Sequence, residues 1–161
     1  MPAGGVVPLT AAPQSAVDGL LNAGKIAQVN ATGPARGVDV SKAARFLDNA
    51  ATSLVALTTL SAPPGMIFDV AYNACHDAGE AMLAAYGYRT ASGPGAHVTV
   101  GRFLEAIFDQ PPAQTAGRAF DTLRAARNGL RYEAKNPTST HLSAALSAAR
   151  TLVPAAAARL T

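Results

Sequence analysis

Hydrophobic side chains recur at intervals of three and four residues along most of this chain, which is the spacing of one face of an α-helix. Segments rich in glycine and proline separate these stretches. The pattern predicts helices at residues 13–30, 39–57, 65–86, 97–108, 112–135 and 139–159. The third is the clearest, because its apolar stripe runs from Ile67 to Ala85 and Gly87 follows as a C-terminal cap.

Residues that begin or end helices support this division. Asp39 or Ser41 can cap the second helix, and Thr138 can cap the last. Pro137 stops the fifth helix, because the residue before a proline avoids the helical region. Pro154 is expected to kink the last helix.

Composition and length agree with one helical domain. The chain has 161 residues, of which 49% are hydrophobic and 14% charged, which excludes a disordered chain. Alanine is the commonest residue and favours helices. We expect an all-α fold, an antiparallel bundle of five or six helices at residues 13–161, behind a flexible leader at residues 1–12.

The sequence also excludes several classes of protein. Cys75 is the only cysteine, so a disulfide framework and a cysteine-rich zinc site are excluded. No apolar run approaches 18 residues, and no basic segment precedes an apolar one at the N-terminus. We therefore expect a cytoplasmic protein without a membrane span. Its low charge content favours burial of apolar surface in an oligomer or against a partner.

A polar stripe follows one face of the third predicted helix. Asp69, Asn73, His76 and Glu80 lie four, three and four residues apart. A solvated outer face would have the same pattern. However, two carboxylates, an amide and an imidazole include the groups that transfer protons near neutral pH. This stripe is therefore a candidate supporting face of an active site.

The net charge of +3 arises in the C-terminal part of the chain, where the fifth predicted helix carries a basic stripe. Its members, three or four residues apart, are Arg124, Arg127, Arg131 and Lys135. Such residues can simply make a helix soluble while their stems cover apolar surface. The alternative is a rim that binds phosphate or RNA, because guanidinium groups bind phosphate in a bidentate manner.

Three segments together resemble the HEPN superfamily, all-helical proteins abundant in prokaryotic toxin–antitoxin and anti-phage systems. They are YNACHDAGEAMLAAYGYR (72–89), GAHVTVGRFL (95–104) and FDTLRAARNGLRYEA (120–134). The resemblance covers about residues 40–153. The family signature is an arginine, usually followed by a polar residue such as asparagine, and then a histidine four to six residues on. Arg127 and Asn128 match its beginning, and Tyr132 stands in place of the histidine.

The resemblance implies a homodimer in which two such helices form a basic cleft. Active members are metal-independent endoribonucleases, in which arginine and histidine assist the attack of a ribose 2′-hydroxyl on the adjacent phosphate. It thereby implies Arg127, Asn128 and Tyr132 as candidate catalytic residues and RNA as substrate, and His76 of the polar stripe is a further catalytic candidate. A cognate antitoxin or a nucleotidyltransferase-type protein is the implied partner.

The tyrosine leaves three hypotheses, because a phenol that titrates near pH 10 is a poor base at pH 7. Tyr132 can support a modified mechanism with Arg127, or His76 can supply the imidazole. Alternatively, the site is inactive and the chain is a module that binds RNA or a partner protein. We expect His97, in a loop, and His141, in the first turn of the last helix, to be surface histidines. The three histidines lack metal-ligand spacing, so we expect no metal or other cofactor.

Overall fold

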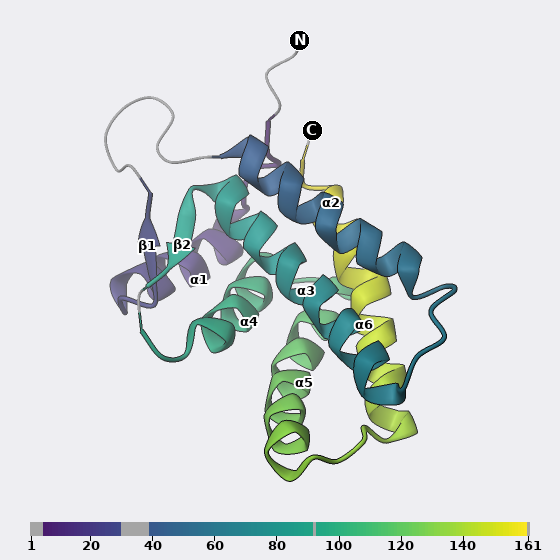
Figure 1. Ribbon diagram of the computed structural model, residues 1–161. Coiled ribbons are helices and arrows are strands. Elements are labelled where there is room, and N and C mark those ends of the chain that lie inside the picture. The colour runs from purple at the N-terminus through teal and green to yellow at the C-terminus, as the bar shows by residue number, and fades with distance from the viewer. Residues whose placement is uncertain (1–4, 30–38, 92, 161) are drawn as a thin grey trace.

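The computed structural model describes residues 5–29, 39–91 and 93–160, which form six α-helices and one short antiparallel sheet (Figure 1). In chain order the elements are α1 (Ala11–Asn22), β1 (Ile26–Gln28), α2 (Val40–Ala56), α3 (Pro64–Tyr86), β2 (Tyr88–Thr90), α4 (Ala96–Ile107), α5 (Ala113–Glu133) and α6 (Ser139–Ala157). The predicted all-α fold is confirmed, and each predicted helix corresponds to an observed one.

The predicted capping residues act as expected. The carboxylate of Asp39 accepts a hydrogen bond of 2.8 Å from the backbone N–H of Lys42, at the start of α2. Gly87 ends α3 with φ of 83°, a conformation that glycine adopts without strain. Thr138 and His141 cap α6 reciprocally, because each side chain accepts from the other residue's backbone N–H. Thus three helix boundaries follow from local chemistry alone.

The first helix is shorter than the predicted segment 13–30, and that prediction is wrong at its end. The chain turns at Gly24, whose φ is 69°. Residues 26–28 then form β1, in which Ile26 lies opposite Thr90 of β2. Ile26 is buried, so its apolar character reflects packing of this ribbon rather than a continuing helix face. The sheet joins two segments far apart in sequence, which no local pattern indicates.

The predicted flexible leader also needs correction over the residues that the structure describes. Residues 1–4 lie outside them. The backbone N–H of Val7 donates to the carbonyl oxygen of Arg159 at 2.8 Å, and Val6 pairs with Leu160. The hydroxyl of Tyr86 donates to the carbonyl oxygen of Val7 at 2.7 Å. Val6 and Val7 are therefore held against the end of the chain, and α1 begins at Ala11.

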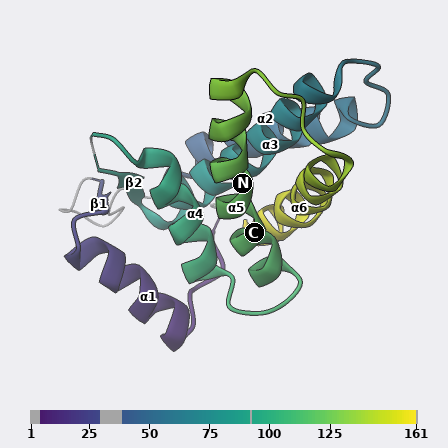
Figure 2. The ribbon, with the colours of Figure 1, turned by 90° about the horizontal axis from the view of Figure 1, so that it is seen from below.

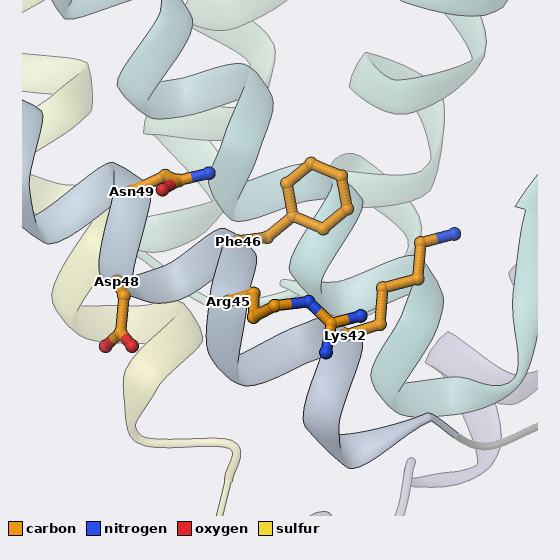
Figure 3. Close-up of a pocket in the computed structure, with 5 residues that line it drawn as sticks. All are labelled: Lys42, Arg45, Phe46, Asp48 and Asn49. Carbon is orange, nitrogen blue, oxygen red and sulfur yellow. The ribbon is translucent and has the colours of Figure 1, made fainter.

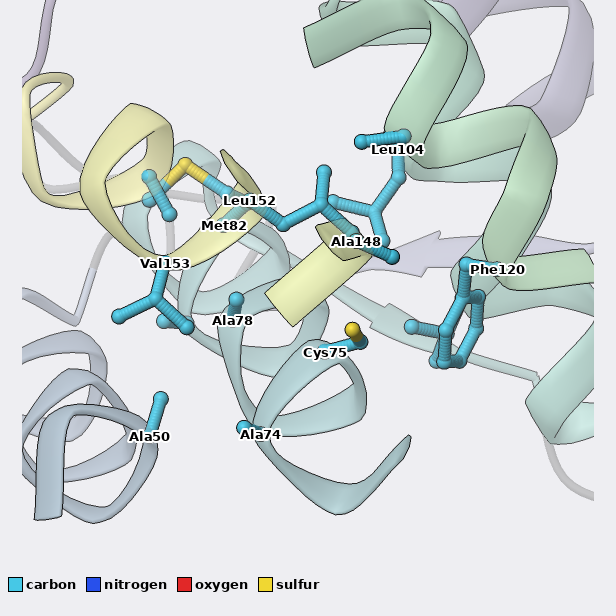
Figure 4. Close-up of a cluster of buried hydrophobic side chains, with 14 of the residues drawn as sticks. Ala50, Ala74, Cys75, Ala78, Met82, Leu104, Phe120, Ala148, Leu152 and Val153 are labelled. Atoms are coloured by element: carbon cyan, nitrogen blue, oxygen red, sulfur yellow. The ribbon is translucent and has the colours of Figure 1, made fainter. Parts of the chain in front are cut away.

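Helix α3 lies at the centre of the molecule and packs against α2, α4, α5 and α6. Helix α1 lies at the edge, beside α4 (Figure 2). Most residues of α3 from Ala71 to Ala85 are buried, and small side chains dominate its contacts with α2 and α6 (Figure 4). Of the described helices, none is long and apolar enough to cross a membrane.

Helices α3 and α4 approach each other closely at Gly79. A Cβ atom on Gly79 would lie 2.3 Å from Cγ1 of Val100 and 3.3 Å from Cδ1 of Leu104. Val100 and Leu104 are fully buried, so neither side chain can move aside freely. The separation between α3 and α4 therefore depends on the absence of a side chain at this position.

We expect Gly79→Ala to destabilise the fold by about 1–3 kcal/mol, because overpacking exceeds the gain in helix propensity. Gly19→Ala is the matched control, because Gly19 lies in α1 with open space around it. That variant should leave the free energy of unfolding unchanged or raise it by up to about 1 kcal/mol. Urea denaturation measures both changes, and equal stability of the two variants would contradict the close contact.

Candidate functional site

A cavity of about 280 Å³ opens where the middle of α3, the start of α4 and the second half of α5 meet. We call it the central cavity. The described residues that line it are Tyr72 of α3, Gly95–Val98 at the start of α4, and Arg124, Arg127 and Asn128 of α5. Three helices thus bring an aromatic ring, an imidazole and two guanidinium groups to one hollow.

Two histidines from different helices stack beside this cavity. The ring centroids of His76 and His97 are 4.4 Å apart, and the ring planes are inclined by 29°. Nδ1 of His97 lies 3.1 Å from the hydroxyl oxygen of Tyr72, and the tautomer of His97 decides which of the two donates. His97 is exposed, whereas Tyr72 is fully buried. The contact between Tyr72 and His97 therefore connects the protein interior to solvent.

Tyr72 links the site to the hydrophobic core. Its ring stacks on Phe120 of α5 at a centroid distance of 5.0 Å and an interplanar angle of 17°. Phe120 is also fully buried. Because the ring is buried and stacked on Phe120, the position of its hydroxyl is set by core packing rather than by the solvent.

Arg127 carries the positive charge nearest these rings. Its guanidinium carbon lies 4.8 Å from the centroid of Tyr72, a cation–π distance. Its Nε donates to Oδ1 of Asp69 at 3.3 Å, and Oδ2 of the same carboxylate lies 3.5 Å from Nη2 of Arg131. One carboxylate thus orients two guanidinium groups and neutralises only one of the two charges.

The protonation of the histidines follows from burial and from these cations. Burial, His97 and Arg127 together lower the pKa of His76 to about 4. Burial also lowers the pKa of His97, with contributions from Arg127 and Arg124. Burial raises the pKa of Tyr72 to about 12. At pH 7 the site therefore holds two neutral imidazoles and a neutral phenol beside permanent positive charge.

Glu80 lies near His76, but His76 remains neutral at pH 7. Its Oε1 is 3.8 Å from Nε2 of His76, which is too long for a hydrogen bond. A carboxylate at this distance favours the imidazolium, whereas burial and Arg127 favour the neutral ring. Burial also raises the pKa of Glu80 itself, which weakens the pair further. We therefore describe His76 and Glu80 as neighbours rather than as an ion pair.

The structure brings several of the predicted site residues together. His76 and Asp69 from the polar stripe, and Arg124, Arg127 and Asn128 from α5, lie in or beside the central cavity. Glu80 reaches the cluster only through His76. The two predicted stripes thus face the same hollow, which their separate spacing along the sequence did not require.

Other predicted residues lie away from this hollow. Tyr132 is 92% exposed, and its hydroxyl forms no hydrogen bond within the described part of the chain. Asn73 is exposed as well. Arg131 and Lys135 line a second cavity of about 200 Å³, which shares Arg127 with the central one. The arginine and tyrosine of the signature-like segment therefore do not meet within one chain.

Sequence reasoning missed two members of the site. His97, expected in a loop, lies in the first turn of α4. It is exposed as expected of a surface histidine, but its ring contacts both His76 and Tyr72. Tyr72 precedes His76 by four residues, so helical spacing places them on one face and could have indicated it. No signal in the sequence indicates His97, because its partners belong to another helix.

A more open cavity of about 500 Å³ lies over α2, and its described lining residues all belong to that helix (Figure 3). They are Lys42, Arg45, Phe46, Asp48 and Asn49. The described lining residues include two cations but no histidine. This surface therefore offers less chemistry than the hollow between α3, α4 and α5.

Two further observations limit the chemistry of the site. Within the ranges that the structure describes, no group of three histidine, cysteine, aspartate or glutamate side chains could hold a metal ion. Cys75 is fully buried, and burial raises the pKa of its thiol to about 12, so it is not a nucleophile at pH 7. The polar groups that the described residues bring to this site are imidazole, phenol, guanidinium, amide and carboxylate groups.

The lowered pKa of His76 predicts a loss of stability in acid. Below pH 6.5 the unfolded chain binds a proton at His76, but the folded protein does not until pH approaches about 4. We expect wild type to lose on the order of 2–3 kcal/mol more than His76→Gln between pH 7 and pH 4.5. Asp77 and Glu80, whose raised pKa values act in the opposite direction, are present in both proteins. Urea denaturation at both pH values measures this, and equal losses would contradict a buried neutral imidazole.

The site is thus built from the side chains of three helices and the charge that α5 supplies. Comparisons with protein-family models, with curated proteins and with solved structures find no match for this chain.

Proposed function

We propose that this protein binds RNA in the central cavity and cleaves it without a metal ion. The observation that carries the proposal is the convergence of Arg124 and Arg127 with His97 in one hollow. Guanidinium groups bind phosphate, and a neutral imidazole can accept a proton. These are the groups that attack of a ribose 2′-hydroxyl on the adjacent phosphate requires.

His97 is the proposed general base. In the tautomer that serves this role, Nδ1–H donates to the Tyr72 oxygen and Nε2 is free to accept the proton of the 2′-hydroxyl. A bond then forms between O2′ and phosphorus while the bond from phosphorus to O5′ breaks. O5′ takes a proton from water, and His97 returns its proton to the solvent. The products are a 2′,3′-cyclic phosphate and a 5′-hydroxyl.

The arginines stabilise the charge that develops on the phosphate oxygens. Arg127 is oriented by Asp69 and by the face of Tyr72, so it needs little rearrangement when a phosphate binds. Burial is the main reason that the pKa of His97 is lowered, and a bound phosphate offsets the further contribution of Arg127 and Arg124. Substrate binding therefore makes His97 a stronger base.

The resemblance to the HEPN superfamily agrees with this proposal. It implies an endoribonuclease of a toxin–antitoxin or defence system, and Arg127 and Asn128 of the signature-like segment line the central cavity. It also implies a homodimer. In a dimer the exposed Tyr132 of one chain could reach the hollow of the other, which light scattering combined with a Tyr132→Phe variant would test.

A second candidate is a module that binds RNA, or a nucleotidyltransferase-type partner, without cleaving. The observation that favours it is the lowered pKa of both histidines, which leaves no imidazolium to protonate the leaving oxygen at pH 7. The phenol of Tyr72, with a pKa of about 12, is a weak acid. This candidate predicts RNA binding, or a stable complex with the partner, and no product.

Cleavage of RNA by the purified protein in EDTA tests the proposal. We expect Arg127→Ala to lower the rate by about 10²–10³-fold through loss of charge stabilisation. His97→Ala should lower it by about 10²–10⁴-fold through loss of the base. Arg118→Ala is the matched control, because Arg118 is an exposed arginine at the start of the same helix. Wild-type activity in Arg127→Ala would overturn the proposal, whereas binding without cleavage in wild type would favour the second candidate.

Tyr72→Phe separates positioning from binding. The variant keeps the ring that stacks on Phe120 but removes the hydroxyl that orients His97. We expect kcat to fall by about tenfold or more while KM changes little, because the arginines still hold the phosphate. The melting temperature should stay close to that of wild type. A wild-type kcat in Tyr72→Phe would contradict a positioning role for the hydroxyl.

A further inference from the structure

We infer that the site extends into a third cavity at Lys25 and Arg102, and that a single strand of RNA several nucleotides long lies across all three cavities. This inference rests on the proposed function and names its substrate class. It assigns a binding role to Leu20 of α1, to Lys25 in the turn before β1, and to Arg102 of α4, none of which is a proposed catalytic residue.

The three cavities adjoin one another through shared lining residues. Arg127 lines both the second cavity, at the end of α5, and the central cavity. Gly95 and Val98 line both the central cavity and a third cavity of about 380 Å³. Figure 2 shows α1, α4 and α5 in succession on this side, and α4 packs against both of the others. The cavities therefore form one path, which we call the basic groove.

Positive charge accompanies the whole basic groove. Six of the chain's 13 basic residues line it, in the order Lys135, Arg131, Arg127, Arg124, Arg102 and Lys25. The carboxylates paired with these cations are those of Asp69, Asp121 and Glu133. Lys25 and Arg102 form no ion pair among the residues that the structure describes. Basic residues thus outnumber the carboxylates paired with them along this path. In a chain with only 14% charged residues, this excess of positive charge favours a polyanion as the ligand.

The third cavity combines charge with apolar surface. Leu20, Ala23 and Val98 contribute apolar lining, and Lys25 and Arg102 contribute cations at the rim. A nucleotide presents the matching pair of surfaces, because its base is flat and largely apolar and its phosphate is anionic. An acidic peptide has charge along its length but no comparable apolar ring at each unit. The cavity chemistry therefore favours RNA over an acidic peptide.

The dimensions favour a single strand. Arg124 and Arg131 are seven residues apart on α5, which is about 10 Å along the helix. The third cavity extends the path beyond Arg124, on the far side of the α4 start. Separate hollows of about 200, 280 and 380 Å³ can each receive an unstacked base, whereas the bases of a duplex stay inside the stack.

The test compares the binding of two 2′-O-methyl oligouridylates, a dinucleotide and an octanucleotide, by competition fluorescence anisotropy. The methyl group blocks the attacking hydroxyl, so cleavage does not disturb the measurement. We expect wild type to bind the octanucleotide at least 100-fold more tightly than the dinucleotide. A Lys25→Ala, Arg102→Ala double variant should reduce this ratio about tenfold and the salt slope of octanucleotide binding by about 1.4.

A Lys42→Ala, Arg45→Ala double variant is the matched control, because it removes two cations from α2, outside the basic groove. It should retain the wild-type ratio. The inference is overturned if both double variants lose the same affinity, if the ratio is near one, or if polyglutamate competes as well as the octanucleotide. None of these results bears on cleavage itself. The proposed function is overturned by a different result, which is wild-type cleavage by Arg127→Ala.

Discussion

The contact between Gly79 and Val100 is the constraint on which the site depends. It allows α4 to approach α3 more closely than any larger residue would permit. His76 lies three residues before Gly79, and His97 lies three residues before Val100. One turn along each helix from this crossing, the two imidazoles therefore meet at a centroid distance of 4.4 Å. A residue without a side chain thus determines how closely His76 approaches His97, the proposed general base.

Tyr72 transmits the packing of the core to the polar groups. Its ring stacks on Phe120 and lies within 4.8 Å of the guanidinium carbon of Arg127, and its hydroxyl meets His97. Burial keeps the phenol protonated, since it raises the pKa to about 12. The same burial, with the nearby arginines, keeps both imidazoles neutral at pH 7. The imidazoles and the phenol of the site are therefore neutral, whereas the arginines beside them are cationic. This arrangement suits an anionic ligand.

The sequence predicted much of the fold because the signals for helices are local. The caps at Asp39, Gly87 and Thr138 involve residues within a few positions of one another. The β1–β2 ribbon and the attachment of Val6 and Val7 to the end of the chain could not be predicted in this way. Each joins backbone groups separated by at least 60 residues, and backbone groups carry no sequence signature of their partner.

For the candidate site, the sequence by itself determined which groups lie on a common helix face. The spacing of Asp69 and His76 on α3, and of Arg124 and Arg127 on α5, follows from the helical repeat. Only the tertiary structure decided that these faces meet, that His97 joins them and that Tyr132 points into solvent. The physical reason is that helical periodicity fixes directions around one axis, whereas the meeting of two helices depends on how closely their buried residues pack.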